Sequence, residues 1–183
     1  MPPRILPAHP KRVLAFFPHR RLTGRTALDG PALVPRSFAT LDMRHPHVAT
    51  DAHLELLVAR SVERYRPALV AIGVPGRAPQ DVELGRWAAK VVRHFGIDCV
   101  FVDVTVAAGC VLEERSLRGF DRLGQQIAIR VPDLSTHVLA QKGTSSTFNR
   151  RRSRSYAWKA ALTALAASGH PELVRSLFDA TSV

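Results

Sequence analysis

The sequence predicts an α/β fold built around a mixed β-sheet. The continuous apolar run at residues 68–74 and the largely apolar run at residues 99–104 are typical of central strands that are buried on both faces. A helical pattern of apolar residues precedes each run, so parallel pairing through right-handed helical crossovers is expected. Shorter strand patterns separated by turn residues come before them, and these favour an opening meander of three antiparallel strands.

The first part of the chain is predicted to be an irregular arm followed by strands. Four prolines interrupt regular hydrogen bonding within residues 1–11, so this segment is assigned to the arm. Residues 13–17 are apolar and predict a buried strand, and residues 25–28 and 34–43 alternate well enough to predict the next two. Asp29-Gly30-Pro31 supplies the turn between those two strands.

The two crossover helices follow from apolar residues that recur every three or four positions. Thr50 and Asp51 offer a start for the first helix, which Pro67 closes. The second helix is predicted from about Asp81 until Gly96 stops it. The expected buried faces comprise Leu54, Leu57, Val58, Ser61, Val62 and Tyr65 in the first helix, and Leu84, Trp87, Ala88, Val91, Val92 and Phe95 in the second.

The pattern beyond the last apolar run is less regular. Residues 105–115 predict a helix, and residues 126–131 predict a short strand. Residues 136–154 are rich in Ser, Thr, Gly and Arg, which favours a basic connector without regular structure. An alanine-rich helix is predicted over residues 155–167, and a short C-terminal helix that begins at a proline is predicted within residues 169–183.

The composition indicates a globular and strongly basic protein. Lysine and arginine total 26 of the 183 residues against 15 acidic residues, which gives a formal net charge of +11. A field this positive favours polyanionic partners, with nucleic acid first and anionic lipid or an acidic protein next. No window approaches the roughly 18 apolar residues of a membrane span, and the N-terminus lacks a secretory pattern. Cys99 and Cys110 form neither a disulfide framework nor a zinc motif, so a cytoplasmic location is expected.

Four short motifs follow one another in an informative order. Phe17-Pro18-His19 is followed, after three residues, by Thr23-Gly24; then come LVAIGVPG (69–76), FVDV (101–104) and SYAWKAALTALAA (155–167). Together they resemble the RuvC-type Holliday-junction resolvases and the related YqgF group, in which an apolar strand leads into Asp-Pro-Gly and then Thr-Gly. The resemblance implies an RNase H-like domain over residues 12–168, with a three-strand meander, two parallel strands reached through helical crossovers, and flanking helices.

The resemblance also implies a reaction and its ligands. In that family, two magnesium ions about 4 Å apart hydrolyse phosphodiesters, held by carboxylates from the first strand, the fourth strand and the last helix. The corresponding positions here carry Phe17, Gly73 and, on the helix, Tyr156 and Lys159. Because magnesium requires oxygen ligands, the resemblance implies that these positions are vacated, and we expect no catalytic residue, no metal site and no other cofactor.

Three acids are candidate substitutes. Asp103 follows an apolar strand, close to where parallel strands present their carboxyl ends, and is the best fallback ligand. Asp29 is most simply a turn residue, and Asp42 falls near the end of the third strand. A single carboxylate is more often a hydrogen-bonded strand-end group than a catalyst, so magnesium is expected only if the protein is an active endonuclease.

Two clusters of basic residues offer a nucleic-acid surface. In the second cluster, guanidinium groups that bind phosphate bidentately come just before a helix start, which attracts anions. For the first cluster, the resemblance implies that this face meets the nucleic-acid backbone. A solvated turn and a solvated connector are the simpler alternatives. The predicted nucleic-acid-binding residues are His19, Arg20, Arg21 and Arg25 beside the vacated site, and Arg150, Arg151, Arg152 and Arg154 before the last helix.

Three functions are consistent with these observations. The leading prediction is a nucleic-acid-binding protein that has lost hydrolysis, prefers DNA to RNA, and acts as a non-catalytic subunit of a larger assembly or as a homodimer. The second is an active magnesium-dependent endonuclease, resembling a junction resolvase, with relocated acids. The third is a scaffold that uses the fold for protein contacts alone. No membrane partner is expected under any of the three.

Overall fold

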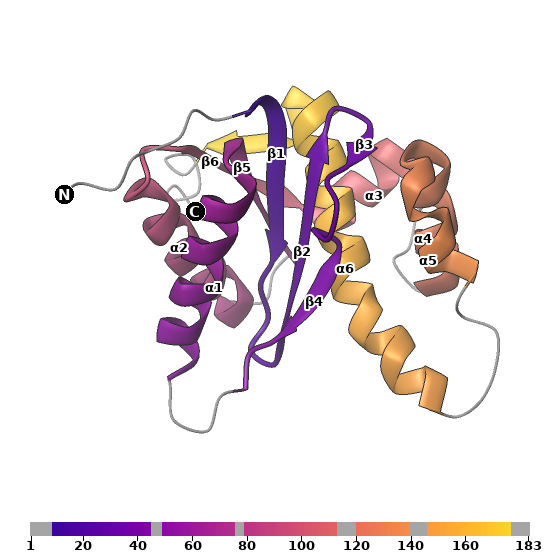
Figure 1. Cartoon of the computed structure of the whole chain (residues 1–183), viewed down its shortest axis with the longest axis horizontal. Coiled ribbons are helices and arrows are strands. Elements are labelled where there is room, and N and C mark those ends of the chain that lie inside the picture. Colours follow the sequence, from indigo (N-terminus) through magenta and orange to yellow (C-terminus); the bar gives the residue numbers. More distant parts are fainter. Residues whose placement is uncertain (1–8, 45–48, 76–78, 113–119, 140–145, 177–183) are drawn as a thin grey trace.

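The chain folds into a central sheet with helices on both faces, as its computed structural model shows (Figure 1). The structure describes residues 9–44, 49–75, 79–112, 120–139 and 146–176. On one side of the sheet lie α1 (Thr50–Tyr65) and α2 (Pro79–Arg93). On the other side lie α3 (Val104–Leu112), α4 (Phe120–Arg130), α5 (Ser135–Leu139) and α6 (Ser146–Gly169).

The sheet is mixed, as predicted. Its strands are β1 (His9–Phe17), β2 (Leu22–Asp29), β3 (Ala32–Leu33), β4 (Ala39–Asp42), β5 (Pro67–Val74), β6 (Asp98–Asp103) and β7 (Val174–Ser176). They follow the order β3-β2-β1-β5-β6-β7, and β4 also pairs with β2. β2 is antiparallel to β1, whereas β5 is parallel to β1 and β6 is parallel to β5. The α/β class, with an opening antiparallel unit and parallel strands reached through α1 and α2, is confirmed.

The predicted third strand, residues 34–43, is wrong in its first half. A turn separates β3 from β4, and both of these short strands pair with β2. Pro35 has no backbone donor, and Arg36 takes the left-handed conformation at φ 62°. The Ser37 N–H donates to the Val34 carbonyl at 3.1 Å. These residues close a turn, so regular pairing resumes only at Ala39.

The segment predicted as a strand at residues 126–131 is helical instead. Leu123, Ile127 and Val131 recur every four residues and are buried, whereas Ile129 is 69% exposed. That spacing is helical, and it turns one face of α4 and its end toward the core.

The basic connector predicted over residues 136–154 is also wrong in part. α5 takes up its first residues, and α6 begins at Ser146 rather than at Ser155. Arginine is a strong helix former, and the run from Ser146 onward contains neither proline nor glycine before the helix end. The run therefore extends α6 toward the N-terminus. Residues 140–145 lie outside the described ranges.

Both ends of the chain differ from their predictions. β1 begins at His9, so residues 9–11 of the predicted arm belong to a strand, and residues 1–8 lie outside the described part. Pro171–Leu173 forms a 3-10 turn, after which β7 pairs antiparallel with β6. The predicted C-terminal helix is therefore limited to this single 3-10 turn and is wrong for residues 174–176, which pair with the otherwise open edge of β6. Residues 177–183 are not described.

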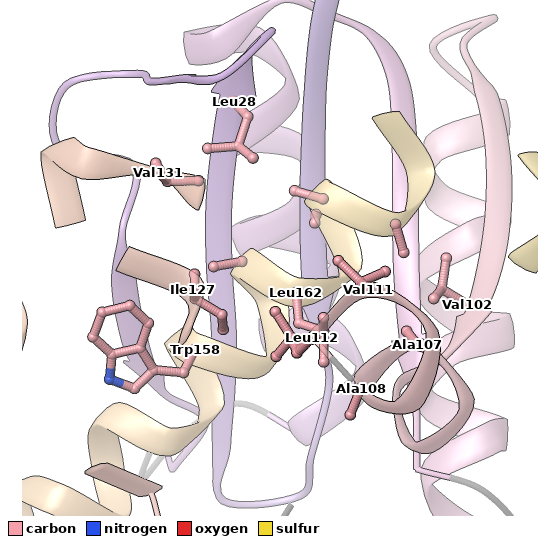
Figure 2. Close-up of a cluster of buried hydrophobic side chains, with 14 of the residues drawn as sticks. Leu28, Val102, Ala107, Ala108, Val111, Leu112, Ile127, Val131, Trp158 and Leu162 are labelled. Carbon is pink, nitrogen blue, oxygen red and sulfur yellow. The ribbon is translucent and has the colours of Figure 1, made fainter. Parts of the chain in front are cut away.

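Alternation along the strands sends successive side chains into opposite layers. Leu14 and Phe16 of β1 pack in the cluster that includes α1 and α2. Figure 2 shows the other cluster, where Trp158 and Leu162 of α6 are buried among side chains of α3 and α4. Phe17 alternates with Phe16 and therefore faces α6, which positions the site described next.

Candidate functional site

The carboxyl ends of β1 and β5 meet helix α6 at one edge of the sheet. Phe17 is the last residue of β1, and Gly73 is the penultimate residue of β5. A Cβ atom added to Gly73 would stand 3.0 Å from Phe17 Cδ2 and 3.0 Å from Val104 Cγ1. The Lys159 ammonium of α6 lies 4.8 Å from the centroid of the Phe17 ring. We call Phe17, Gly73, Val104, Tyr156 and Lys159 the Phe17 site.

Apolar and aromatic side chains fill the Phe17 site. Phe17 is 2% exposed and packs with Val104 and Ala160. The Tyr156 ring lies beside it, with the two ring centroids 6.0 Å apart. The Lys159 ammonium lies 5.6 Å from the Tyr156 ring as well, so it makes cation–π contacts with both rings. The only formal charge that these five side chains carry is therefore positive.

These residues do not fit the two magnesium ions that the resemblance implies. Magnesium binds hard oxygen ligands, and Phe17, Gly73 and Lys159 supply no side-chain oxygen. A longer side chain at Gly73 has no space, because its Cβ would collide with Thr163 Oγ1. Within the described ranges, no group of three or more His, Cys, Asp or Glu side chains is arranged to hold a metal ion.

Helix α6 is fixed against β2 next to this site. Gly24 allows the close approach, because a Cβ there would collide with the Tyr156 carbonyl oxygen and stand 2.9 Å from the Ala157 nitrogen. The buried Thr26 hydroxyl donates to the Ala157 carbonyl at 3.2 Å. Gly24 of the Thr-Gly motif, together with Thr26, therefore sets where Tyr156 and Lys159 lie.

Asp103, the fallback ligand, has a local structural role. Its Oδ1 accepts hydrogen bonds from the Thr105 N–H at 2.8 Å and the Val106 N–H at 3.3 Å. These are the first N–H groups of α3, which have no partner inside the helix. Asp103 is therefore the N-cap of α3.

We expect Asp103→Ala to lower the free energy of unfolding by about 1 kcal/mol, because the α3 cap is lost. Asp103→Asn should restore most of that loss, since asparagine caps helices about as well as aspartate. Urea denaturation measures both. If the alanine variant were as stable as the parent chain, the capping role would be wrong.

The other two acids are too distant to share a metal ion with Asp103. Asp29 pairs in register with Arg12, five residues before Phe17, or about 17 Å along the strand. Its carboxylate forms an ion pair with Arg12 at 2.9 Å. Asp42 lies on β4, four strand spacings or about 19 Å from β6. Side-chain and backbone hydrogen bonds from Arg44 lower the pKa of Asp42 to about 2, so its charge is already paired.

Basic residues that are exposed or partly exposed come shortly after Phe17 in the sequence. Arg20 and Arg21 lie in the turn between β1 and β2, and both are exposed. His19 is partly exposed; its Nδ1 accepts a hydrogen bond from the Arg21 N–H at 3.3 Å, and its ring lies 5.1 Å from the Tyr156 ring. The structure thus keeps these three residues beside the site.

Arg25 does not lie beside the Phe17 site, and that part of the prediction is wrong. Thr26, the next residue of β2, hydrogen-bonds to α6. Because successive side chains of a strand point to opposite faces, the Arg25 side chain lies on the α1 side of the sheet. There its guanidinium donates to the Ser37 carbonyl at 3.3 Å and the Arg36 carbonyl at 3.1 Å, and lies 5.1 Å from the Tyr65 ring. Burial lowers the pKa of Arg25. These contacts tie β2 to α1.

The arginine-rich run lies in the first turns of α6 rather than before the helix. The Arg154 guanidinium donates to the His137 carbonyl at 3.2 Å and so connects α6 to α5. Burial, followed by the charge of Arg154, lowers the pKa of His137. Figure 1 shows the start of α6 extending away from the sheet. The side chains of Arg150, Arg151 and Arg152 lie outside what the structure describes.

A cleft on the α1 and α2 side of the β1–β2 turn was not predicted. It has a volume of about 440 Å³ and is lined by Arg20, Asp51, Glu83, Leu84, Arg86, Trp87 and Lys90. The Trp87 indole donates to the Asp51 carbonyl at 3.1 Å. No local pattern marks this cleft, because its three elements meet only in the tertiary structure. Thr163 was also missed, although its spacing of seven residues from Tyr156 places both on one helical face.

Solved structures that are similar to the chain over most of its length include two of RuvC. Thermus thermophilus RuvC gives a TM-score of 0.61 at 12% sequence identity, over 91% of this chain and 99% of that one. The chain has an RNase H-like fold. T. thermophilus RuvC in complex with a Holliday junction substrate gives a TM-score of 0.53 at 14% identity, with the same coverage. No family model and no curated protein sequence matches the chain.

Similarity at this level of identity establishes the RNase H-like fold, and function must be argued from the site. The fold explains why residues 17, 73 and 159 converge, because their elements meet at one sheet edge. None of the helices in the described ranges combines the length and apolar character that crossing a bilayer requires.

Proposed function

We propose that this chain binds nucleic acid, DNA in preference to RNA, and does not cleave it. The observation that carries the proposal is the Lys159 ammonium, 4.8 Å from the ring of buried Phe17, where the resemblance implies metal-binding acids. A phosphodiester is attracted to this charge, but a pair of divalent cations does not assemble without carboxylates. These residues therefore support binding without hydrolysis.

The charge distribution supports a polyanionic partner. The chain carries a formal net charge of +11, and the exposed Arg20 and Arg21 lie in the turn that comes after Phe17. Arginine and lysine side chains in such a position contact phosphates irrespective of base sequence. The RuvC structure that holds a Holliday junction has a similar fold, which supports DNA as the class of partner.

Binding is expected to weaken steeply as salt is raised. Each neutralised phosphate releases counterions and contributes about 0.9 to the slope of log K against log salt, so roughly four to six contacts give a slope of about −4 to −5. Fluorescence anisotropy with labelled four-way junction, duplex DNA, single-stranded DNA and RNA at several salt concentrations measures the slope and the preference. Absence of binding to all four probes at the lowest salt would overturn the proposal.

The same samples test hydrolysis. With magnesium or manganese present, we expect the labelled strands to stay intact on a denaturing gel. Strand scission by the purified chain would show that the proposed loss of hydrolysis is wrong. The proposal that the chain binds nucleic acid would be unaffected.

A further inference from the structure

We propose that the Lys159 ammonium binds a nucleic-acid phosphate at the Phe17 site. It takes the place of a metal ion there, so that binding needs no divalent cation. The inference rests on the proposed function and identifies the group that makes the contact. It concerns binding alone, because the surrounding residues supply no group for hydrolysis.

The position of Lys159 is fixed by its surroundings before any ligand arrives. The residue stands on α6, whose preceding turn is held against β2 at Gly24 and Thr26. Its ammonium contacts two rings, 4.8 Å from Phe17 and 5.6 Å from Tyr156. A charge held on a rigid helix loses less conformational freedom on binding than a free surface lysine does.

The immediate surroundings favour an anion at this position. Lys159 is partly exposed, so one side of the site is open to solvent. The buried side chains of Phe17 and Val104 form the inner side of the site. The turn that follows Phe17 adds the exposed charges of Arg20 and Arg21.

A consequence is that magnesium should weaken nucleic-acid binding here, whereas it strengthens binding at a site that carboxylates line. Where acids line a site, magnesium bridges the carboxylates and the phosphate, and it therefore strengthens binding. Where an ammonium lines the site, magnesium instead competes for the phosphate as any counterion does. We therefore expect EDTA to leave the affinity unchanged and millimolar magnesium to weaken binding.

The test compares three variants by anisotropy with the labelled four-way junction, in EDTA and in magnesium. Lys159→Gln is expected to weaken binding about fivefold to tenfold at 0.1 M salt and to reduce the salt slope by about 1. Lys159→Arg should retain the slope of the parent chain. Lys11→Gln is the matched control, because it removes the same charge from an exposed position near the amino end of β1, six residues or about 20 Å along the strand from Phe17. It should behave like the parent chain.

A second measurement uses the unaltered protein. The sequence has only four lysines, Lys11, Lys90, Lys142 and Lys159, so acetylation by N-hydroxysuccinimide acetate can be assigned residue by residue in a mass spectrometer. Excess junction DNA is expected to protect Lys159 and to leave Lys11 reactive.

The outcomes separate this inference from the proposed function. If the parent chain binds none of the probes at low salt, both are wrong. If the parent chain binds but Lys159→Gln keeps its affinity and slope, or Lys159 stays reactive in the complex, only the inference is wrong. Binding that EDTA abolishes would overturn it as well.

Discussion

Replacing Gly24 with alanine is expected to destabilise the fold by more than about 3 kcal/mol, at the upper end of what overpacking costs. The added Cβ would collide with the Tyr156 carbonyl oxygen and stand 2.9 Å from the Ala157 nitrogen. Both are backbone atoms of a helix that is packed into the core, so no side-chain rotation relieves the contact. Separating α6 from β2 would also break the buried hydrogen bond from Thr26 to Ala157.

Thermal unfolding followed by circular dichroism measures this effect. At roughly 2–4 °C per kcal/mol for a domain of this size, the midpoint should fall by about 6–12 °C or more. Gly169→Ala is the matched control, because a Cβ at the end of α6 meets no atom within 4 Å, and its midpoint should stay near that of the parent chain. An unchanged midpoint for Gly24→Ala would show that α6 does not pack on β2 as described.

Reversing both charges of the β1–β2 turn, Arg20→Glu with Arg21→Glu, is expected to weaken nucleic-acid binding by about 50-fold or more at 0.1 M salt. Two phosphate contacts are lost, which lowers the salt slope by about 2, and the new carboxylates repel the backbone. Both side chains are exposed, so the stability of the fold should hardly change. Anisotropy titrations at several salt concentrations give both quantities.

The control for this double variant must change the net charge equally. Arg60→Glu with Arg64→Glu does so on α1, where both side chains are exposed and neither is part of the predicted surface. It should weaken binding much less, because only the long-range field changes and salt screens it. Equal losses in the two double variants would mean that net charge, rather than the turn, governs binding.

Local patterns were sufficient for most of the elements that build this fold. The apolar runs predicted β5 and β6, and the helical spacing of Leu54 and Val58 predicted α1, because burial on one face or on both leaves a period in the sequence. The same reasoning failed at residues 126–131, where a short apolar stretch is compatible with either period. It also failed at β7, whose three residues become a strand only because β6 offers an open edge.

The candidate site was predictable to a similar degree. Family resemblance singled out Phe17, Gly73 and Lys159, and the fold brings these positions together. Asp103 was considered more plausible as a hydrogen-bonded strand-end group than as a catalyst, and its Oδ1 accepts hydrogen bonds from two N–H groups at the start of α3. Arg25 was assigned to the wrong face, because its contacts with Ser37 and Tyr65 form across the sheet and helix layers rather than along the strand.

Composition, charge and the alternation of apolar residues are local properties, and the chain alone was enough to derive the α/β class and the parallel core strands. The tertiary structure was needed to see that Lys159 lies over Phe17, that Gly24 sets the distance between α6 and β2, and that Arg25 faces away. The reason is physical: these contacts join residues on different elements, and many of the residues are far apart in the sequence, such as Thr26 and Ala157 at a separation of 131. Their geometry depends on how whole layers pack, which no short stretch of sequence specifies.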